Sequence, residues 1–157
     1  MFRSLRATLA TVVLTTAVTA VSFGSAGATN IGNEGCTPGY WKNHTENWEE
    51  YRNPNDPLVN QFRSANLYKV SKNMTYLQAL QGGGGAGVDG AVKILLRASV
   101  AAILNAAHEG VGYPLRRFVD YKLVAQVNAA LERGNRQTML KLAAYLDAAN
   151  NLGCPLN

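Results

Sequence analysis

The sequence contains few cysteines, few histidines and few charged residues. Its 157 residues include two cysteines and two histidines, and 16% of them are charged, against about 25% in an average protein. Two cysteines cannot build an all-cysteine zinc site. The 47% of hydrophobic residues is enough for a packed core, and the length fits one domain. The composition therefore excludes a disordered chain and predicts a single globular domain.

The first 28 residues have the three parts of a secretory signal peptide. Arg3 and Arg6 form a positive start, residues 7–23 carry no charge, and Ala26-Gly27-Ala28 is a small-x-small cleavage sequence. The apolar part contains several threonines, which makes it a poor membrane anchor, and no second run of spanning length follows. We therefore predict cleavage after Ala28 and a secreted, extracellular domain of residues 29–157.

Removal of the signal peptide changes the charge balance of the protein. The formal net charge falls from +5 to +3 when Arg3 and Arg6 leave. Arg116-Arg117 is then the one basic doublet, and no basic stripe with interleaved aromatic residues is present. This balance argues against nucleic acid as a partner.

Cys36 and Cys154 lie near the two ends of the mature chain. In an oxidising compartment, an even pair of cysteines at such positions predicts a disulfide. The bond would bring the two ends of the domain together. Two free or intermolecular thiols are the alternative that the sequence leaves open.

The spacing of apolar residues predicts an all-α fold of four to five helices. No segment shows sustained strand alternation. The expected helices cover about 38–51, 73–81, 90–108 and 115–133, and a last helix stops around Cys154. Gly134 is expected to end the fourth helix and Asn135 to cap the last one. The alanine-rich helix 90–108 is apolar nearly all round, which predicts a central, buried position with Asp89 as its N-cap. The predicted architecture is a single helical domain around this helix, with its two ends joined by the disulfide.

The segment Cys36–His44 concentrates side chains that are useful for binding. Thr37-Pro38 is typical of a helix start. Trp41, His44, Trp48 and Tyr51 recur at spacings of three and four, which places them on one face of the expected helix. One interpretation is that these residues form the core and that His44 is a hydrogen-bonded core histidine. The other is a binding surface, whose candidate residues are Tyr40, Trp41, Lys42, Asn43 and His44.

The two histidines, His44 and His108, support an enzymatic alternative. With Glu109, which follows His108, they could serve a small secreted hydrolase or a metal-dependent enzyme. However, the histidines do not have the spacing of a zinc-binding helix, and paired cysteines could not add ligands. We therefore predict no metal site and no cofactor. A positive charge on His108 at a helix C-terminus already has a structural use.

Two further patterns have weak functional content. Gly85-Ala86-Gly87-Val88-Asp89-Gly90 matches the dinucleotide-binding pattern letter for letter, but a helix precedes it where that motif requires a strand. We interpret it as a flexible or tightly packed connection. Asn43 and Asn73 each begin an Asn-x-Thr triplet, which is a glycan acceptor only in a eukaryotic secretory pathway.

The opening segment resembles a motif of exported, mostly uncharacterised microbial proteins. The resemblance rests on four segments, namely Cys-Thr-Pro-Gly-Tyr-Trp-Lys-Asn-His at 36–44, 77–81 with the following glycines, 95–97 with 105–107, and Asn-Asn-Leu-Gly-Cys-Pro at 150–155. It implies export and an intact domain but no catalytic residues. The sequence as a whole favours a secreted, non-catalytic extracellular or cell-surface module. It leaves the ligand unknown, and an extracellular glycan or protein is the kind of partner that remains open.

Overall fold

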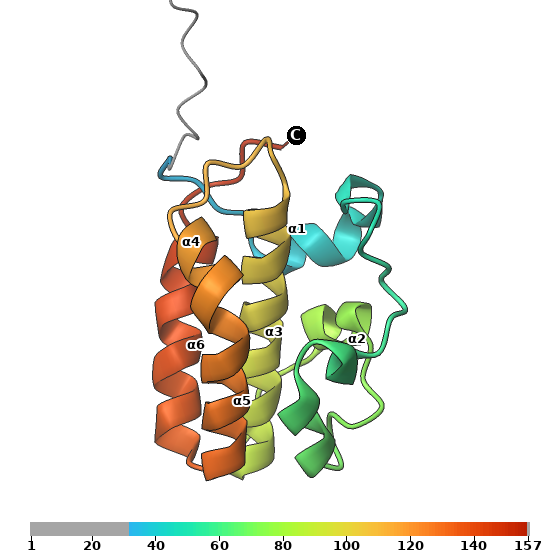
Figure 1. The fold of residues 1–157 in the computed structure, drawn as a ribbon, viewed down its shortest axis with the longest axis vertical. Coiled ribbons are helices and arrows are strands. Elements are labelled where there is room, and N and C mark those ends of the chain that lie inside the picture. The colour runs from blue at the N-terminus through green and yellow to red at the C-terminus, as the bar shows by residue number, and fades with distance from the viewer. Residues whose placement is uncertain (1–31, 157) are drawn as a thin grey trace, which may run out of the picture.

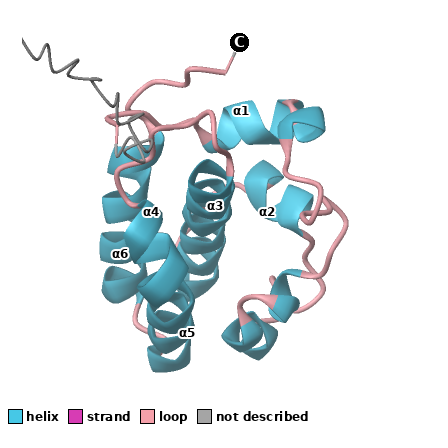
Figure 2. Ribbon diagram, turned by 45° about the horizontal axis from the view of Figure 1, so that its top comes forward, coloured by secondary structure: helices cyan, strands magenta, loops and turns pink. Residues whose placement is uncertain are grey.

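A computed structural model describes residues 32–156, so the expected signal peptide and its cleavage site after Ala28 lie outside the described residues. The α-helices are α1 (Pro38–Asn43), α2 (Tyr76–Gln81), α3 (Gly87–Ala107), α4 (Arg116–Phe118), α5 (Val124–Arg133) and α6 (Arg136–Asn150). Residues Val119–Leu123 are π-helical and join α4 to α5 without a break. Counted in this way, the described part of the chain has five helices and no strand, as Figure 2 shows. The predicted all-α class is confirmed.

The central position of α3 is also confirmed. In Figure 1, α5 and α6 lie on one side of α3, and α1 and α2 lie on the other. Most α3 side chains are buried, including Leu95, Leu96 and Leu104. The helix packs most extensively against α6. A helix without a polar face needs apolar neighbours on nearly every side, and its alanines allow those neighbours to approach closely.

The start of α3 differs from the prediction, and the glycine run explains why. The N-cap is Ala86, and Asp89 lies in the first turn of the helix, so the Asp89 cap was wrong. A Cβ at Gly90 would collide with the carbonyl oxygen of Gly85. The preceding loop therefore lies directly on the first turn of α3. The connection is tightly packed where Gly85 meets Gly90, whereas a Cβ at Gly83 or Gly87 would meet open space.

The first helix is shorter than predicted. Thr37 is the N-cap, as expected, and accepts a hydrogen bond from the backbone N–H of Tyr40. The helix ends at Asn43, however, because the indole N–H of Trp48 donates to the carbonyl oxygen of Trp41 at 3.0 Å. That oxygen would otherwise accept the next bond of the helix. The single face predicted through residue 51 is therefore wrong, and Tyr51 is 66% exposed.

The segment between α1 and α2 covers the side of α3 and α5. It contains short 3-10 turns at Leu58–Asn60 and Arg63–Leu67. Leu58 and Phe62 are fully buried. The backbone N–H and side-chain hydroxyl of Ser64 donate to Asn128 and Glu132 on α5 at 2.9 and 2.8 Å. A polar, proline-containing segment is thus held in place by side-chain hydrogen bonds rather than by a long helix of its own.

The C-terminal half follows the sequence-based expectation closely. Gly134 adopts the left-handed conformation that ends α5, and the Asn135 side chain caps α6 by accepting from the backbone N–H of Thr138. The π-helical turn at Val119–Leu123 was not predicted. Within residues 32–156, no helix is both long and apolar enough to cross a membrane.

The predicted disulfide is confirmed. Cys36 and Cys154 are bonded across a sequence separation of 118 residues. Beside this bond, the backbone N–H of Gly35 donates to the carbonyl oxygen of Gly153 at 2.9 Å. The segments before α1 and after α6 consequently lie together at one end of the helices, at the top of Figure 1.

Candidate functional site

The opening segment is held in the core by one buried asparagine. Oδ1 of Asn105, on α3, accepts the backbone N–H of Cys36 at 2.7 Å and the indole N–H of Trp41 at 3.1 Å. Its Nδ2 donates to the carbonyl oxygen of Cys36 at 2.9 Å. A buried amide whose donors and acceptors are all matched stabilises one arrangement of the chain around it. Asn105 therefore sets how the opening segment lies on α3.

A second buried asparagine extends this network to the end of α6. Oδ1 of Asn150 accepts hydrogen bonds from Nδ2 of Asn105 at 3.1 Å and from the hydroxyl of Tyr113 at 2.7 Å. Its Nδ2 donates to the carbonyl oxygen of Ala98 at 3.0 Å. Burial raises the pKa of Tyr113, so its hydroxyl stays protonated and remains a donor. The network joins the opening segment, α3 and α6 within the core.

Close backbone packing completes the attachment of the opening segment. A Cβ at Gly35 would collide with the carbonyl oxygen of Ala149 near the end of α6. Gly35 is thus required by the close approach of the chain to that helix. Gly35, the disulfide and the two buried asparagines together hold the opening segment and the segment around residues 150–154 in place.

The five candidate binding residues do not share one environment. Trp41 is fully buried, and its ring lies in the core. Lys42 and Asn43 are exposed, whereas Tyr40 and His44 are half-buried. A ligand can therefore reach the other four candidates but not the buried ring of Trp41.

The half-buried pair Tyr40 and His44 forms a small local cluster. Their rings stack with centroids 4.4 Å apart, and the Tyr40 hydroxyl accepts a hydrogen bond from Asn47 at 2.6 Å. Nδ1 of His44 lies 3.0 Å from Oε1 of Glu46. Hydrogen bonds from the backbone N–H of Glu46 and from His44 lower the pKa of the Glu46 carboxyl. The Tyr40 hydroxyl and Nδ1 of His44 thus already have hydrogen-bond partners in this cluster.

The second histidine, His108, lies near the ring of Trp41. The rings of His108 and Trp41 have centroids 6.0 Å apart, and Nδ1 of His108 accepts the backbone N–H of Gly110 at 3.0 Å. Among the described residues, no three His, Cys, Asp or Glu side chains are grouped so that they could hold a metal ion. Both histidines therefore have local partners, and neither is placed in a carboxylate-rich cluster.

A polar groove adjoins the exposed edge of α1. It has a volume of about 280 Å³. The residues that line it are Pro38, Gly39, Lys42, Leu80, Gln81, Gly82, Arg97, Asp147 and Asn151. All four segments on which the sequence resemblance rests contribute to this groove. Its charged groups are two cations, Lys42 and Arg97, and one carboxylate, Asp147.

Arg97 is the most unusual member of the polar groove. It projects from α3, where it interrupts an otherwise apolar stretch, and its Nη1 donates to the carbonyl oxygen of Gly82 at 3.5 Å. Its Nε is buried and has no hydrogen-bond partner among the described residues. Buried donors in folded proteins nearly always have a partner. The guanidinium thus retains donor capacity that the described residues do not use.

Asp147 faces the same groove from α6. Its burial raises the pKa of the carboxyl above the ordinary value of 3.8, and the nearby positive charge of Arg97 opposes this only in part. Because the pKa is raised in the folded protein, ionisation of Asp147 costs folding free energy.

Asp147→Asn should therefore stabilise the protein at neutral pH. Because the folded pKa is raised, the penalty in the native protein is present at pH values above the raised pKa and disappears as pH falls below 3.8. Thermal unfolding of both proteins between pH 3 and 7 checks this. The variant should melt at the higher temperature at pH 7 and at the same temperature near pH 3. A lower melting temperature for the variant at pH 7 would contradict the assignment.

Sequence reasoning identified one of the three charged residues of the polar groove. Lys42 was a candidate, but Arg97 and Asp147 were not, because each lies in a helix that reads as structural. The available signal was Arg97, which with Lys93 is one of two cations within a helix that is apolar nearly all round. Such a charge rarely enters a core without a partner. Tyr40, Asn43 and His44 do not line the groove.

The geometry of these residues is the basis for inferring function. The groove offers donors from Lys42 and Arg97, an acceptor from Asp147, and side-chain amides from Gln81 and Asn151. No protein-family model, curated protein or solved structure matches this chain.

Proposed function

We propose that this protein is a secreted, non-catalytic binding module that holds an anionic sugar of an extracellular glycan in the polar groove. The observation that carries the proposal is the convergence of Lys42, Arg97 and Asp147 on one polar groove. The signal-peptide pattern and the disulfide support export, because disulfides persist in oxidising compartments.

The charges of the groove favour a ligand with one carboxylate and several hydroxyls. Two cations outnumber the single carboxylate, so an anionic group is attracted. Arginine binds carboxylates in a geometrically matched, charge-assisted pair. Asp147 and the amides of Gln81 and Asn151 can bind sugar hydroxyls. A uronic acid combines these groups in a molecule that suits a small, open groove.

The enzymatic alternative has no observation in its favour. A hydrolase or metal-dependent enzyme would need His44, His108 and Glu109 to converge. The structure instead pairs His44 with Glu46 and His108 with the backbone of Gly110. The non-catalytic proposal uses a different set of residues and can be tested without reference to the histidines.

Loss of the Lys42 ammonium should abolish most of the binding. The test titrates tetragalacturonate into the protein, produced with its own first 28 residues in an exporting host and recovered with Thr29 at its N-terminus. Lys42→Ala should weaken binding about tenfold, the value of one charge-assisted hydrogen bond. Nuclear magnetic resonance titration reports the affinity and identifies the residues that respond.

Matched controls separate this binding from general electrostatics. Lys72→Ala removes an exposed lysine outside the groove and should leave the affinity unchanged. His44→Ala removes a candidate residue that does not line the groove and should also bind normally. Equal binding of neutral maltotetraose, or an unchanged affinity of Lys42→Ala, would contradict the proposed function.

A further inference from the structure

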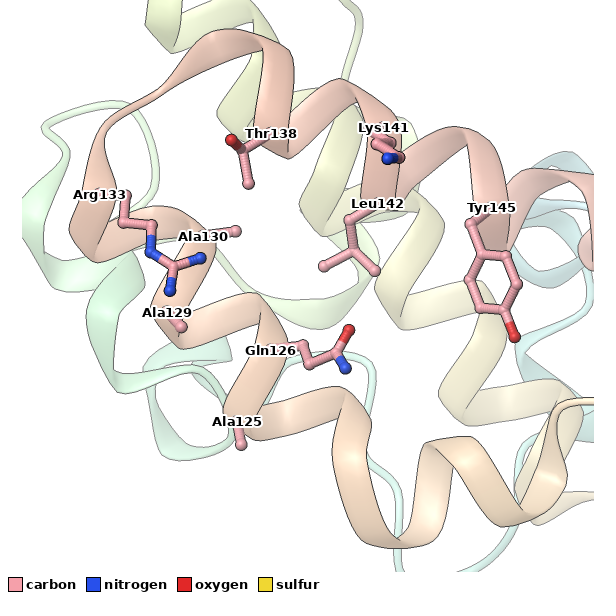
Figure 3. A pocket seen from close by; sticks show the side chains of 9 residues that line it. All are labelled: Ala125, Gln126, Ala129, Ala130, Arg133, Thr138, Lys141, Leu142 and Tyr145. Carbon is pink, nitrogen blue, oxygen red and sulfur yellow. The ribbon is translucent and has the colours of Figure 1, made fainter.

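A second, larger groove lies between α5 and α6 and shares no lining residue with the polar groove. Its volume is about 580 Å³, within the range of about 300–1,000 Å³ that small ligands occupy. Figure 3 shows Leu142 pointing into the space between the two helices, with Ala129 and Ala130 on the facing helix. Arg133 lies at one end of the groove and Tyr145 at the other. We call it the apolar groove.

At the aromatic end of the apolar groove, Tyr145 of α6 packs against Phe118 of α4. Tyr145 is 50% exposed, and Phe118 packs against its ring edge-on with centroids 5.4 Å apart. Phe118 immediately precedes the π-helical turn Val119–Leu123. Such turns are rare and occur frequently at functional sites. Tyr145 is therefore positioned as a rigid apolar wall that remains open to solvent.

The charges of the apolar groove all have one sign. Arg133 and Lys141 line it, and no acidic side chain does. Within residues 32–156, neither cation has an ion-pair partner within 4.0 Å. An apolar floor beside two unpaired cations complements a molecule with a hydrocarbon chain and an anionic head group.

We propose that the apolar groove binds a free long-chain carboxylate. The carboxylate is held by Arg133 at one end of the groove, and the hydrocarbon chain lies over Ala129 and Leu142 toward Tyr145. Lys141 adds positive charge along the α6 side of the groove. A second copy of this protein fits less well, because a two-fold contact would bring the same cations against each other. A docked helix needs an interface of about 800 Å² per partner, more than a single groove between two short helices supplies.

The proposal is tested with laurate, kept below its micelle concentration and titrated into the disulfide-bonded protein. Nuclear magnetic resonance shifts should change at Ala125, Ala129, Leu142 and Tyr145. Shortening the chain should weaken binding by up to about fourfold for each CH₂ removed, and acetate should not bind. Dodecanol, which lacks the charge, should bind more weakly than laurate, by up to about fivefold for each exposed ion pair that it cannot form.

Variants distinguish head-group recognition from nonspecific adsorption. Arg133→Gln/Lys141→Gln should weaken laurate binding by about fivefold. Arg117→Gln/Lys122→Gln removes two exposed cations from the same continuous helix but outside the groove, and should bind laurate normally. Ala129→Phe fills the groove from a partly exposed position and should abolish binding.

Several results would overturn the proposal. One is equal affinity for laurate and dodecanol, and another is full binding by the Arg133→Gln/Lys141→Gln variant. Concentration-dependent shifts at Leu142 and Tyr145 without laurate would assign the groove to a second copy instead. Binding of an acidic amphipathic peptide with no response to laurate would assign it to a protein partner. Failure of Ala129→Phe to fold would leave the charge variants as the deciding measurement.

Discussion

Replacing Cys36 and Cys154 together by alanine should lower the free energy of unfolding by about 4–5 kcal/mol. The bond closes a loop with a sequence separation of 118 residues, so its removal greatly increases the conformational freedom of the unfolded chain. We expect the helices to keep their packing in the variant, because Cys36 and Cys154 are two residues at the edge of a core that side chains of α3, α5 and α6 mainly fill. Urea denaturation followed by circular dichroism measures the difference.

Reduction provides an independent version of the same experiment. Treatment of the unaltered protein with reductant should shift the unfolding midpoint by the same amount as the double alanine variant. The control is the variant itself, whose midpoint should not respond to reductant. An unaltered midpoint on reduction, with the thiols shown to be free, would refute the stabilising role of the bond. A large effect would also mean that the protein reaches full stability only in an oxidising compartment.

Asn105→Ala should destabilise the protein by about 3–4 kcal/mol. The substitution removes the partner of the Cys36 backbone and of the Trp41 indole, all of which are buried. Buried groups left without partners carry their full desolvation cost. Urea denaturation of the oxidised protein measures this effect while the disulfide still constrains the unfolded chain.

Asn43→Ala is the matched control for this prediction. It makes the same chemical change within the opening segment, but at an exposed position at the end of α1. Its stability should stay within about 0.5 kcal/mol of the unaltered protein. Equal stability of the Asn105→Ala and Asn43→Ala variants would show that the buried network contributes nothing. Because Asn105 binds the backbone of Cys36, its loss and the loss of the disulfide should not be additive.

The two proposed sites differ in how far the sequence could have located them. Lys42 stood out because it lies in a dense, polar and aromatic segment. Arg97 and Asp147 are separated from it by tens of residues and join it only because α3 and α6 pack side by side. The apolar groove had no sequence signal, because Leu142 reads as an ordinary core position of an amphipathic helix. Only the spacing between α5 and α6 leaves it open to solvent.

Local patterns were reliable where a short-range physical effect decides the structure. Thr37 and Asn135 cap helices because a side-chain oxygen can reach the next free N–H groups. Gly134 ends a helix because it tolerates the left-handed conformation. The same patterns failed where a distant group intervened. The indole of Trp48 ends the first helix early, and the packing of Gly85 against Gly90 moves the start of α3.

Periodicity predicted the all-α class, and the absence of a polar face predicted the central place of helix 90–108. The two cysteines favoured a bond between Cys36 and Cys154, and the folded protein shows it. Only helix packing places Trp41 in the core and Lys42 beside Arg97 and Asp147, because burial and side-chain pairing depend on how the helices lie against one another. Helix packing brings together residues that are far apart in the sequence, and the sequence pattern does not show that they are in contact.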